Sequence, residues 1–436
     1  MNSVARIPAN EHGINPREID KRARSILKAL TRAGYEAYLV GGGVRDLMLG
    51  FHPKDFDIAT SATPEQVKQV LPSTRIIGRR FRLAHVHFGR DYYEVATFRA
   101  PHDKTGGGKT GEHGRIIHDN VYGTVVEDAY RRDFSINAFF YDLQTGEVLD
   151  FVGAKEDLQK RQLRMIGDPV VRYREDPVRM LRAIRFAAKL DLSIEPASEV
   201  PIHHFGFLLD NIAPARLFDE ALKIFHGGKA IKTLQLLRQY KLLQRLFPAA
   251  ERGLQEEEKQ LAEKPDEGSF HKLVYAALQN TDRRIRKNLP VTPAFLFAVM
   301  LWKQVCEAAK EYQEQGNPAL QSMHLAASDA FSEQVKYLSV PRRFSNMTRE
   351  IWTLQGLFNF KNQRRVLNFL EHRRFRAAYD FMCLRAASGE TTSDNCDWWT
   401  LVQEVDMDEK IRMCQRAAPG KHKNKKRTRQ KRRISE

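Results

Sequence analysis

The sequence predicts an α+β protein: a mixed α/β part comes first, a long all-helical part follows, and a disordered basic segment ends the chain. Between Tyr35 and about Phe151, short apolar runs alternate with glycines, which is typical of strands with a few helices between them. From about Asp168 onward, apolar residues recur at helical spacing. Residues 419–436 hold nine Lys or Arg, one acid and almost no apolar residue, a composition that does not fold alone.

The expected elements begin with a helix over residues 15–34. Asn15 suits its N-cap, Pro16 its first position and Gly34 its end. Residues 101–115 are polar and glycine-rich and predict a loop. The strands expected around this loop are Tyr38–Val40, Phe56–Ile58, Leu83–Phe88, Tyr93–Phe98, Ile136–Tyr141 and Val148–Val152.

Helices are expected throughout the second part of the chain, with Gly227-Gly228, Pro248 and Pro341 as punctuation. Their apolar residues recur every three or four positions. The predicted helices are Pro177–Leu190, Ala215–Phe225, Ala230–Leu246, His271–Leu278, Pro293–Ala309, Ala319–Leu338, Asn346–Asn359 and Arg364–Arg385.

Composition excludes several classes of protein. The 436 residues are 42% hydrophobic and 29% charged, which is normal for a folded globule. No stretch approaches 18 apolar residues and no apolar segment opens the chain, so neither a membrane span nor secretion is expected. The four cysteines, Cys306, Cys383, Cys396 and Cys414, match no metal-binding pair and no disulfide framework, so we expect reduced thiols and a cytoplasmic location.

The charge balance points to a polyanionic partner. Lys and Arg number 71 against 54 Asp and Glu, a net charge of +17. The segment from Pro419 contributes much of this excess, but the rest of the chain is basic too. Nucleic acid and a membrane surface are both partners of this kind.

A glycine turn follows the first expected strand. Gly41-Gly42-Gly43 stands between an apolar strand and a helix that is expected to start at Val44. Glycines at such a junction let backbone N–H groups approach phosphate oxygens, and Arg45 could clamp the same phosphate. A tight turn without any ligand explains the glycines alone equally well.

The pair Asp55 and Asp57, a few residues after this turn, favours a ligand-binding role for the turn. Side chains alternate along a strand, so the two carboxylates are expected on one face, with Phe56 and Ile58 on the other, in the core. Carboxylates this close repel one another unless a cation lies between them. Mg²⁺ is bound by one or two carboxylates together with substrate phosphates, which makes it the expected ion.

Two residues are candidates for a third catalytic carboxylate. Glu94 is an acid inside an otherwise apolar strand, although a solvent-facing position on an edge strand would also explain it. Asp133 is the other candidate. It lies between Arg132 and Asn137, and together these three side chains offer the chemistry that binds phosphate and hydroxyl groups.

A basic helix face completes the local signals. Asp176 and Pro177 are expected to start a helix whose apolar residues face the core. At helical spacing, one basic stripe is formed by Arg179, Arg182, Arg185 and Lys189. Such a stripe is usually solvated surface, but the absence of any acid on this face favours contact with a nucleotide or RNA.

Together these stretches resemble the class II template-independent nucleotidyltransferases, which include CCA-adding tRNA nucleotidyltransferases and bacterial poly(A) polymerases. The motifs occur in the family's order and spacing over roughly residues 7–390. They are LVGGGVRD (39–46), DFD (55–57), RRDFSIN (131–137), DFVGAKEDL (150–158) and REDPVRMLRAIRFAAKL (174–190). IIGRRFRLAHVHF (76–88) resembles the stretch that marks the poly(A) polymerase branch, and IPANEHGI (7–14), FRAAYDF (375–381) and the basic tail agree with it.

The resemblance implies a role for each matching residue. Asp55 and Asp57 would bind the catalytic metals, and Asp133 matches an active-site acid. The remaining matches would bind the nucleotide: Gly41, Gly42, Arg45 and Asp46 at the triphosphate, Arg132 and Asn137 elsewhere on the nucleotide, and Asp176 and Arg179 at the base. We add Arg182 and Arg185 of the basic stripe as nucleotide-binding candidates. One departure is Gly153-Ala154, where the family often has two glycines in a loop thought to flex.

The resemblance also implies an architecture of head, neck, body and tail. We expect an N-terminal extension and helix in residues 1–34, a nucleotidyltransferase catalytic head in 35–165 and a helical neck in 166–230. A helical RNA-binding body would occupy 231–400, and a C-terminal segment 401–436 would carry the basic tail from 419.

The predicted function is template-independent polyadenylation, in which AMP passes from ATP to the 3′-hydroxyl of RNA and pyrophosphate leaves. The ion would be Mg²⁺ or Mn²⁺. A CCA-adding enzyme of the same fold is the main alternative, and a non-catalytic RNA-binding protein is the alternative from another class. We expect a monomer whose basic tail is a candidate contact for RNA-decay proteins.

Overall fold

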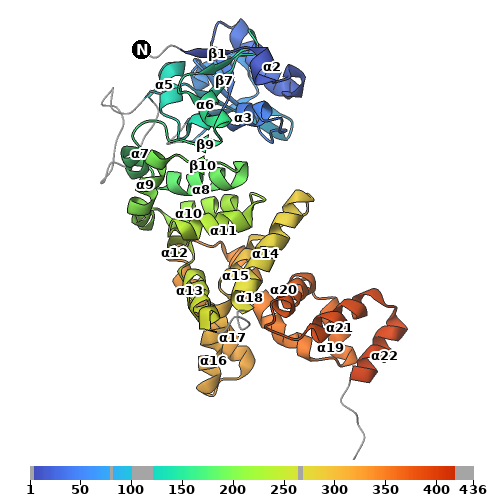
Figure 1. Ribbon diagram of the computed structural model, residues 1–436. Coiled ribbons are helices and arrows are strands. Elements are labelled where there is room, and N and C mark those ends of the chain that lie inside the picture. The colour runs from blue at the N-terminus through green and yellow to red at the C-terminus, as the bar shows by residue number, and fades with distance from the viewer. Residues whose placement is uncertain (1–3, 79–81, 101–120, 264–268, 418–436) are drawn as a thin grey trace, which may run out of the picture. The chain divides into compact units, whose positions relative to one another are not determined.

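The computed structural model describes residues 4–78, 82–100, 121–263 and 269–417. These residues form two compact units, one from residues 1–216 and 232–245 and the other from 217–231 and 246–436 (Figure 1). The first unit holds the sheet and the second is helical, which confirms the predicted α+β class. The predicted loop 101–115 and the basic tail 419–436 lie outside the described residues.

The first unit is built on an eight-stranded mixed sheet in the order β1-β8-β7-β2-β3-β6-β5-β4. Only β3 and β6 pair in parallel, and the other neighbours are antiparallel. The strands are β1 (Ala5–Ile7), β2 (Ala37–Val40), β3 (Asp57–Thr60), β4 (Thr74–Ile77), β5 (Leu83–Phe88), β6 (Asp91–Thr97), β7 (Phe139–Tyr141) and β8 (Val148–Asp150).

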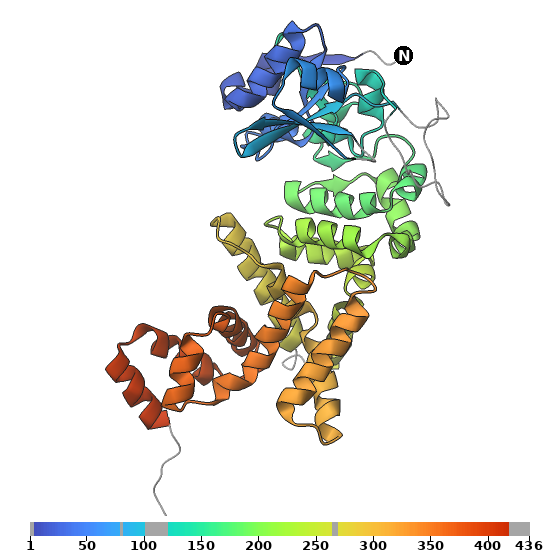
Figure 2. The ribbon, with the colours of Figure 1, turned by 180° about the vertical axis from the view of Figure 1, so that it is seen from behind.

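The two faces of this sheet carry different apolar clusters. The larger cluster joins strand residues such as Leu39, Ile58 and Val95 to the helix α2 (Lys21–Arg32), which lies beside the strands in Figure 2. The smaller one joins Val40, Ala59 and their neighbours to α5 (Val125–Tyr130). The other helices of this part are α1 (Ala9–His12), α3 (Gly42–Met48), α4 (Pro64–Val70) and α6 (Ala154–Gln159).

The first helix differs from its prediction. Asn15 caps only a short 3₁₀ turn, Pro16–Glu18, because Ile19 adopts an extended conformation. The α-helix α2 begins at Lys21 and is capped by Asp20, whose side chain accepts a hydrogen bond from the Arg22 N–H at 2.7 Å. Two successive N-cap signals therefore replace the single one that the pattern predicts.

Helices and a small parallel sheet complete the first unit. The two short strands, β9 (Gln162–Leu163) and β10 (Ser193–Ile194), pair in parallel around α7 (Pro169–Glu175) and α8 (Val178–Leu190). The N-cap of α8 is Pro177, one residue later than predicted, and Oδ1 of Asp176 accepts a hydrogen bond from the Val178 N–H at 3.2 Å. The helices that follow are α9 (Pro196–Phe205), α10 (Pro214–Phe225), most of which belongs to the second unit, and α11 (Ala230–Gln239).

Several predicted helices of the second part are interrupted. Ala230–Leu246 breaks at Lys241, whose φ of 55° ends α11 before α12 (Leu243–Leu246). Pro293–Ala309 and Arg364–Arg385 are each two helices. The remaining helices are α13 (Pro248–Glu263), α14 (Ser269–Arg286), α15 (Pro293–Met300), α16 (Trp302–Glu314), α17 (Ala319–Gln334), α18 (Arg342–Thr353), α19 (Gln363–Leu370), α20 (Phe375–Ala387), α21 (Ser393–Glu404) and α22 (Met407–Ala417).

The cysteine prediction is wrong for one pair. Cys383 on α20 and Cys396 on α21 form a disulfide, with their Cα atoms 5.2 Å apart. The turn between the two helices folds α21 back onto α20, which a separation of 13 residues does not reveal. Cys306 and Cys414 are free thiols.

No helix in the described part of the chain combines the length and the apolar character that a membrane span needs.

Candidate active site at one edge of the sheet

The sheet register collects the predicted acidic residues at one edge. Val40, the last residue of β2, pairs with Asp57, the first residue of β3. β6 runs parallel to β3 with Ile58 opposite Val95, so Asp57 and Glu94 occupy neighbouring positions on the same face. The glycine turn that follows Val40 therefore lies beside the start of β3.

The three carboxylates of this edge differ in their backbone setting. Asp57 begins β3, while Asp55 lies two residues before the strand, so the prediction that both belong to one strand is wrong. The predicted core positions hold, because Phe56 and Ile58 are both buried. Glu94 lies on β6 with a side chain that is half exposed, and its Oε1 is 3.7 Å from Nε2 of His85.

The surroundings of Asp57 disfavour the ionised form of its carboxyl group. Desolvation raises the pKa of its carboxyl, and the negative charges of Glu94 and Asp55 raise it further, against the opposing effect of Arg132. In the described part of the chain, no three His, Cys, Asp or Glu side chains are grouped closely enough to hold a metal ion by themselves. Mg²⁺ does not require such a group, because substrate phosphates and water complete its coordination.

The glycine turn packs closely against charged groups. Gly41 has a φ of 74°, and a Cβ there would lie 3.4 Å from Nη1 of Arg132. At Gly43, a Cβ would lie 3.2 Å from the carbonyl oxygen of Asp55. The turn therefore holds the carboxylate loop and the arginine close to α3, and a larger side chain would push them apart.

Arg45 is a buried guanidinium that joins three elements. It donates from Nη1 to Oδ1 of Asn137 at 2.5 Å, and from Nε and Nη2 to Oδ1 of Asp46 at 2.9 and 2.5 Å. Its guanidinium also lies 5.6 Å from the ring centre of Phe186 on α8. Arg45, Asp46 and Asn137 thus form one connected group, as the motifs predict.

Positive charges gather beside this group. Burial lowers the pKa of Lys189, and the charges of Arg45, Arg185 and Lys54 lower it further, while Asp46 opposes them. The Nζ of Lys189 lies 4.0 Å from Oδ2 of Asp46. The carboxylate of Asp46 is therefore outnumbered by the positive charges around it. Such an excess of positive charge is expected where a polyphosphate binds.

The side chain of Arg132 is held in place by hydrogen bonds to Asp128 and to the backbone of Asn137. Its Nε and Nη2 donate to Oδ2 of Asp128 at 3.2 and 2.9 Å, and its Nη1 donates to the carbonyl oxygen of Asn137 at 3.3 Å. Asp128 is almost fully buried and also binds Arg131. The sequence analysis missed Asp128, and its position one helical turn before Arg132 is the signal that could have found it.

Asp133, unlike Asp57 and Glu94, forms an ion pair with Arg182. Its Oδ2 accepts from Nε and Nη2 of Arg182 at 2.7 and 2.5 Å, and its Oδ1 accepts from the Phe134 N–H and from Asn137. Burial alone would raise the pKa of Asp133, but Arg182 and these hydrogen bonds lower it to about 2. Its two oxygens are already bound within the protein.

The first turns of α8 are braced in a similar way. Asp176 accepts from Nη2 of Arg216 at 2.6 Å. Arg179 donates to the carbonyl oxygen of Arg172 and to Oε2 of Glu175, at 2.7 and 2.8 Å. The basic stripe of α8 is therefore not simply solvated surface, because the side chains of Arg179 and Arg182 are held in fixed places.

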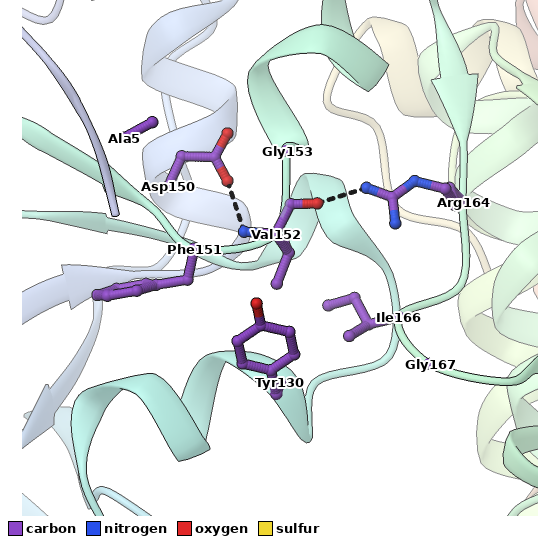
Figure 3. Close-up of a pocket in the computed structure, with 9 residues that line it drawn as sticks. All are labelled: Ala5, Tyr130, Asp150, Phe151, Val152, Gly153, Arg164, Ile166 and Gly167. Atoms are coloured by element: carbon purple, nitrogen blue, oxygen red, sulfur yellow. Dashed lines mark hydrogen bonds between the residues drawn. The ribbon is translucent and has the colours of Figure 1, made fainter. Parts of the chain in front are cut away.

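A pocket of about 500 Å³ opens at the β1–β8 end of the sheet (Figure 3). Tyr130 and Phe151 line this pocket. Arg164 and Val152 line it too, and Nη2 of Arg164 donates a hydrogen bond to the Val152 carbonyl oxygen at 2.5 Å. None of the predicted site residues lines this pocket, and β7 and β2 separate β8 from β3. Gly153, the N-cap of α6, has a φ of 78°, whereas Ala154 after it is an ordinary buried helix residue.

Known families match most of the chain. The Poly A polymerase head domain matches residues 37–164, the Probable RNA and SrmB- binding site of polymerase A matches 191–254, and the Polymerase A arginine-rich C-terminus matches 315–433. Poly(A) polymerase I of Salmonella typhimurium is 44% identical over 91% of this chain and 85% of its own length. Its counterpart from Haemophilus influenzae is 43% identical over 90% and 86%.

CCA-adding enzymes are more distant relatives. The one from Bacillus cytotoxicus is 37% identical over 52% of this chain and 55% of its own length. Among solved structures, the Bacillus stearothermophilus CCA-adding enzyme in complex with CTP is 25% identical, with a TM-score of 0.58 over 89% of this chain and 82% of its own. The comparisons confirm the resemblance that the sequence motifs predict.

Proposed function

The chain belongs to the poly(A) polymerase I family, and from this premise we propose which of its residues carry out the family's reaction. The protein is a nucleotidyltransferase that polyadenylates RNA without a template. AMP passes from ATP to an RNA 3′-hydroxyl, and pyrophosphate leaves. The observation that supports our assignment best is the register that sets Glu94 beside Asp57 at the edge of the sheet.

Asp55, Asp57 and Glu94 would hold the divalent metal that the family uses. Desolvation and the negative charges of Glu94 and Asp55 disfavour the ionised form of Asp57, so a bound cation would stabilise that form. The hard oxygen donors suit Mg²⁺, with Mn²⁺ as a second ion of the same preference. When bound, such an ion neutralises charge on the transferred phosphoryl group and lowers the pKa of the attacking hydroxyl.

We assign the triphosphate to the cluster beside α3. Gly41 and Gly42 would let phosphate oxygens approach the backbone, and Lys189 and Arg185 would supply positive charge near Asp46. Arg132, whose Nη1 lies close to Gly41, would add a further positive charge. Arg45 is buried and fully engaged with Asp46 and Asn137, so its role would be to hold the site together.

Base selection would fall to the start of α8. Asp176 and Arg179 are rigidly placed by Arg216 and Glu175, and both carry hydrogen-bonding groups that a purine edge can meet. Fixed polar groups discriminate between bases better than mobile ones, because a mismatched base leaves them unpaired.

Asp133 would act as a positioning residue and not as a third metal ligand. Both of its oxygens accept strong hydrogen bonds, two of them from Arg182 on α8. The bond between them would fix the α8 stripe against the loop that carries Arg132 and Asn137. Glu94 is then the third carboxylate.

Sequencing the products made with all four nucleoside triphosphates tests the proposed function. A run of A supports it, whereas a terminal CCA would identify the alternative enzyme. Repeating the assay with Mg²⁺ and with Mn²⁺ tests the metal. The five-part domain division, the monomeric state, the cytoplasmic location and contacts of the tail with RNA-decay proteins stay predictions.

A further inference from the structure

The open sheet face next to the carboxylates carries a row of aromatic rings that the proposed function does not use. On the hairpin of β5 and β6, His85 pairs with Glu94 and His87 pairs with Tyr92, so all four side chains lie on one face. Because β6 runs beside β3, this face also carries Asp57. The histidines belong to the stretch LAHVHF that the sequence analysis singled out.

The rings are pre-arranged. His85 and Tyr92 stack with their centres 4.2 Å apart and their planes 10° from parallel, and His87 lies 5.9 Å from Tyr92. His85 is only 9% exposed, whereas 51% of Tyr92 is exposed. One side of the tyrosine ring is therefore supported by the protein and another remains open to solvent.

A polar atom in this row also lacks a partner. Nε2 of His85 is buried and has no hydrogen-bond partner among the described residues, and Oε1 of Glu94 lies 3.7 Å from it, beyond hydrogen-bonding distance. Buried polar groups are rarely left unsatisfied, and an absent ligand or water is a usual reason. This atom points to an occupant beside Glu94.

The strand order identifies the occupant. Gly41 and the positive cluster lie on the β2 side of β3, while Glu94 and Tyr92 lie on the opposite, β6 side. In phosphoryl transfer, the attacking and leaving oxygens are roughly in line on opposite sides of the phosphorus. If pyrophosphate leaves on the β2 side, the RNA 3′-hydroxyl must approach from the β6 side.

We propose that Tyr92, supported by His85, is the stacking platform for the 3′-terminal base of the RNA acceptor. The inference rests on the proposed function, because it takes the reacting centre to be Asp57 and Glu94. Tyr92 and Glu94 are two residues apart on β6, so their side chains lie next to each other on the same face of the sheet. A base stacked on the Tyr92 ring therefore brings its own ribose toward the carboxylates. A supported ring loses little conformational freedom when a base stacks on it. Since every base has a π-face, the subsite accepts any terminal nucleotide.

The test is a single addition from 3′-deoxyATP to two matched RNA acceptors. One ends in an ordinary adenosine, and the other ends in an abasic tetrahydrofuran nucleotide that keeps its 3′-hydroxyl. For Tyr92→Ala, we expect the KM for the ordinary acceptor to rise about tenfold, with the KM for 3′-deoxyATP unchanged. With the abasic acceptor, the variant and the unaltered protein should have the same KM.

Two further variants complete the design. Tyr92→Trp keeps a stacking ring and should retain the low KM for the ordinary acceptor, which separates stacking from a folding defect. Phe207→Ala removes an equally exposed ring, 51% exposed on the 3₁₀ turn Gly206–Asn211, and should not change the ratio between the two acceptors.

An equal loss with both acceptors, or a rise in the KM for the nucleotide, would overturn the inference and leave the polymerase assignment intact. If the unaltered protein adds no nucleotide to either acceptor, it is the proposed function that fails.

Discussion

Arg182 on α8 binds one oxygen of Asp133 with two nitrogens, Nε at 2.7 Å and Nη2 at 2.5 Å. The pair spans 49 residues of sequence and joins the loop before the 3₁₀ turn Ser135–Asn137 to α8. Asp133 is almost fully shielded, with a side chain 11% exposed, and Arg182 is about one-third exposed. Asp133, which matches an active-site acid of the family, is thus bound to α8 through Arg182.

Replacing Asp133 with Asn should destabilise the first unit. The change removes the carboxylate that accepts two hydrogen bonds from the partly buried guanidinium of Arg182, and since Arg182 is still about one-third exposed, the cost is about 2–3 kcal/mol. Urea unfolding near neutral pH measures the loss. Arg182→Lys is the matched control, since it keeps the charge but cannot donate from two nitrogens, and an intermediate loss is expected. Unchanged stability in Asp133→Asn would contradict a structural role.

The same pair predicts how stability depends on pH. The pKa of Asp133 is lowered to about 2, so its contribution is complete above the unfolded pKa near 3.8 and is lost as the pH falls toward 2. A shift of this size corresponds to about 2 kcal/mol. Comparing unfolding at pH 5.5 and pH 2.5, we expect the unaltered protein to lose about 1.5 kcal/mol more stability than Asp133→Asn, because about a third of the contribution remains at pH 2.5. If both proteins lost the same stability between the two pH values, the Asp133 carboxylate would not be the source of the pH dependence.

Asp55→Asn and Asp57→Asn should each abolish AMP transfer, by about 1000-fold or more, while the fold persists. The reason is that both changes remove charge from a cation site and neither side chain belongs to the core. In metal-free buffer, Asp57→Asn should melt at a slightly higher temperature, because desolvation and the neighbouring acids disfavour the ionised carboxyl. Near-normal turnover in either variant would remove these residues from the metal site.

Glu94→Gln separates the two candidates for the third carboxylate. We expect kcat to fall sharply and the divalent-metal requirement to rise, with no loss of stability, because the side chain of Glu94 is half exposed. The comparison with Asp133→Asn is direct, since that variant is expected to lose stability first. A metal titration of turnover for both variants, below their melting temperatures, decides between them. An unaltered metal requirement in Glu94→Gln would return the role to Asp133.

Arg179→Ala should weaken the preference for ATP over CTP by about tenfold, as expected for losing a hydrogen bond from a charged group. The measurement is the ratio of kcat/KM for the two nucleotides. Lys189→Ala is the matched control on the same helix. It is expected to raise the KM for both nucleotides equally, because its charge lies in the triphosphate cluster. If Arg179→Ala only weakens RNA binding, the residue contacts the RNA backbone.

Removing residues 419–436 should leave catalysis at saturating RNA unchanged but raise the KM for RNA. The segment carries nine Lys or Arg and no aromatic residue, so it adds salt-sensitive affinity without base stacking. The slope of log affinity against log salt should become shallower, by up to about 0.7 for each cation that contacts phosphate. An unchanged slope would indicate a solubilising or protein-docking segment.

Much of the site could be predicted because its signals are local. Gly41, Asp57, Asp176 and the basic face of α8 each follow from the period of a strand or helix, or from the chemistry of a turn or cap. Helix breaks were harder to predict. Lys241 adopts a positive φ that its residue type does not favour, and there the Leu242 N–H closes the end of α11 on the Leu237 carbonyl oxygen.

By itself, the sequence determined the α+β class, the order of the elements and the chemical groups of the site, because propensity, periodicity and charge act over a few residues. Only the tertiary structure set Glu94 beside Asp57, bound Asp133 to Arg182, joined Cys383 to Cys396 and aligned Tyr92 with the carboxylates. Each of these depends on strand register or helix packing between segments that are distant in sequence. A one-residue shift in register would turn Glu94 and Tyr92 to the other face of the sheet, and no local pattern in β6 specifies which residue of β3 it will meet.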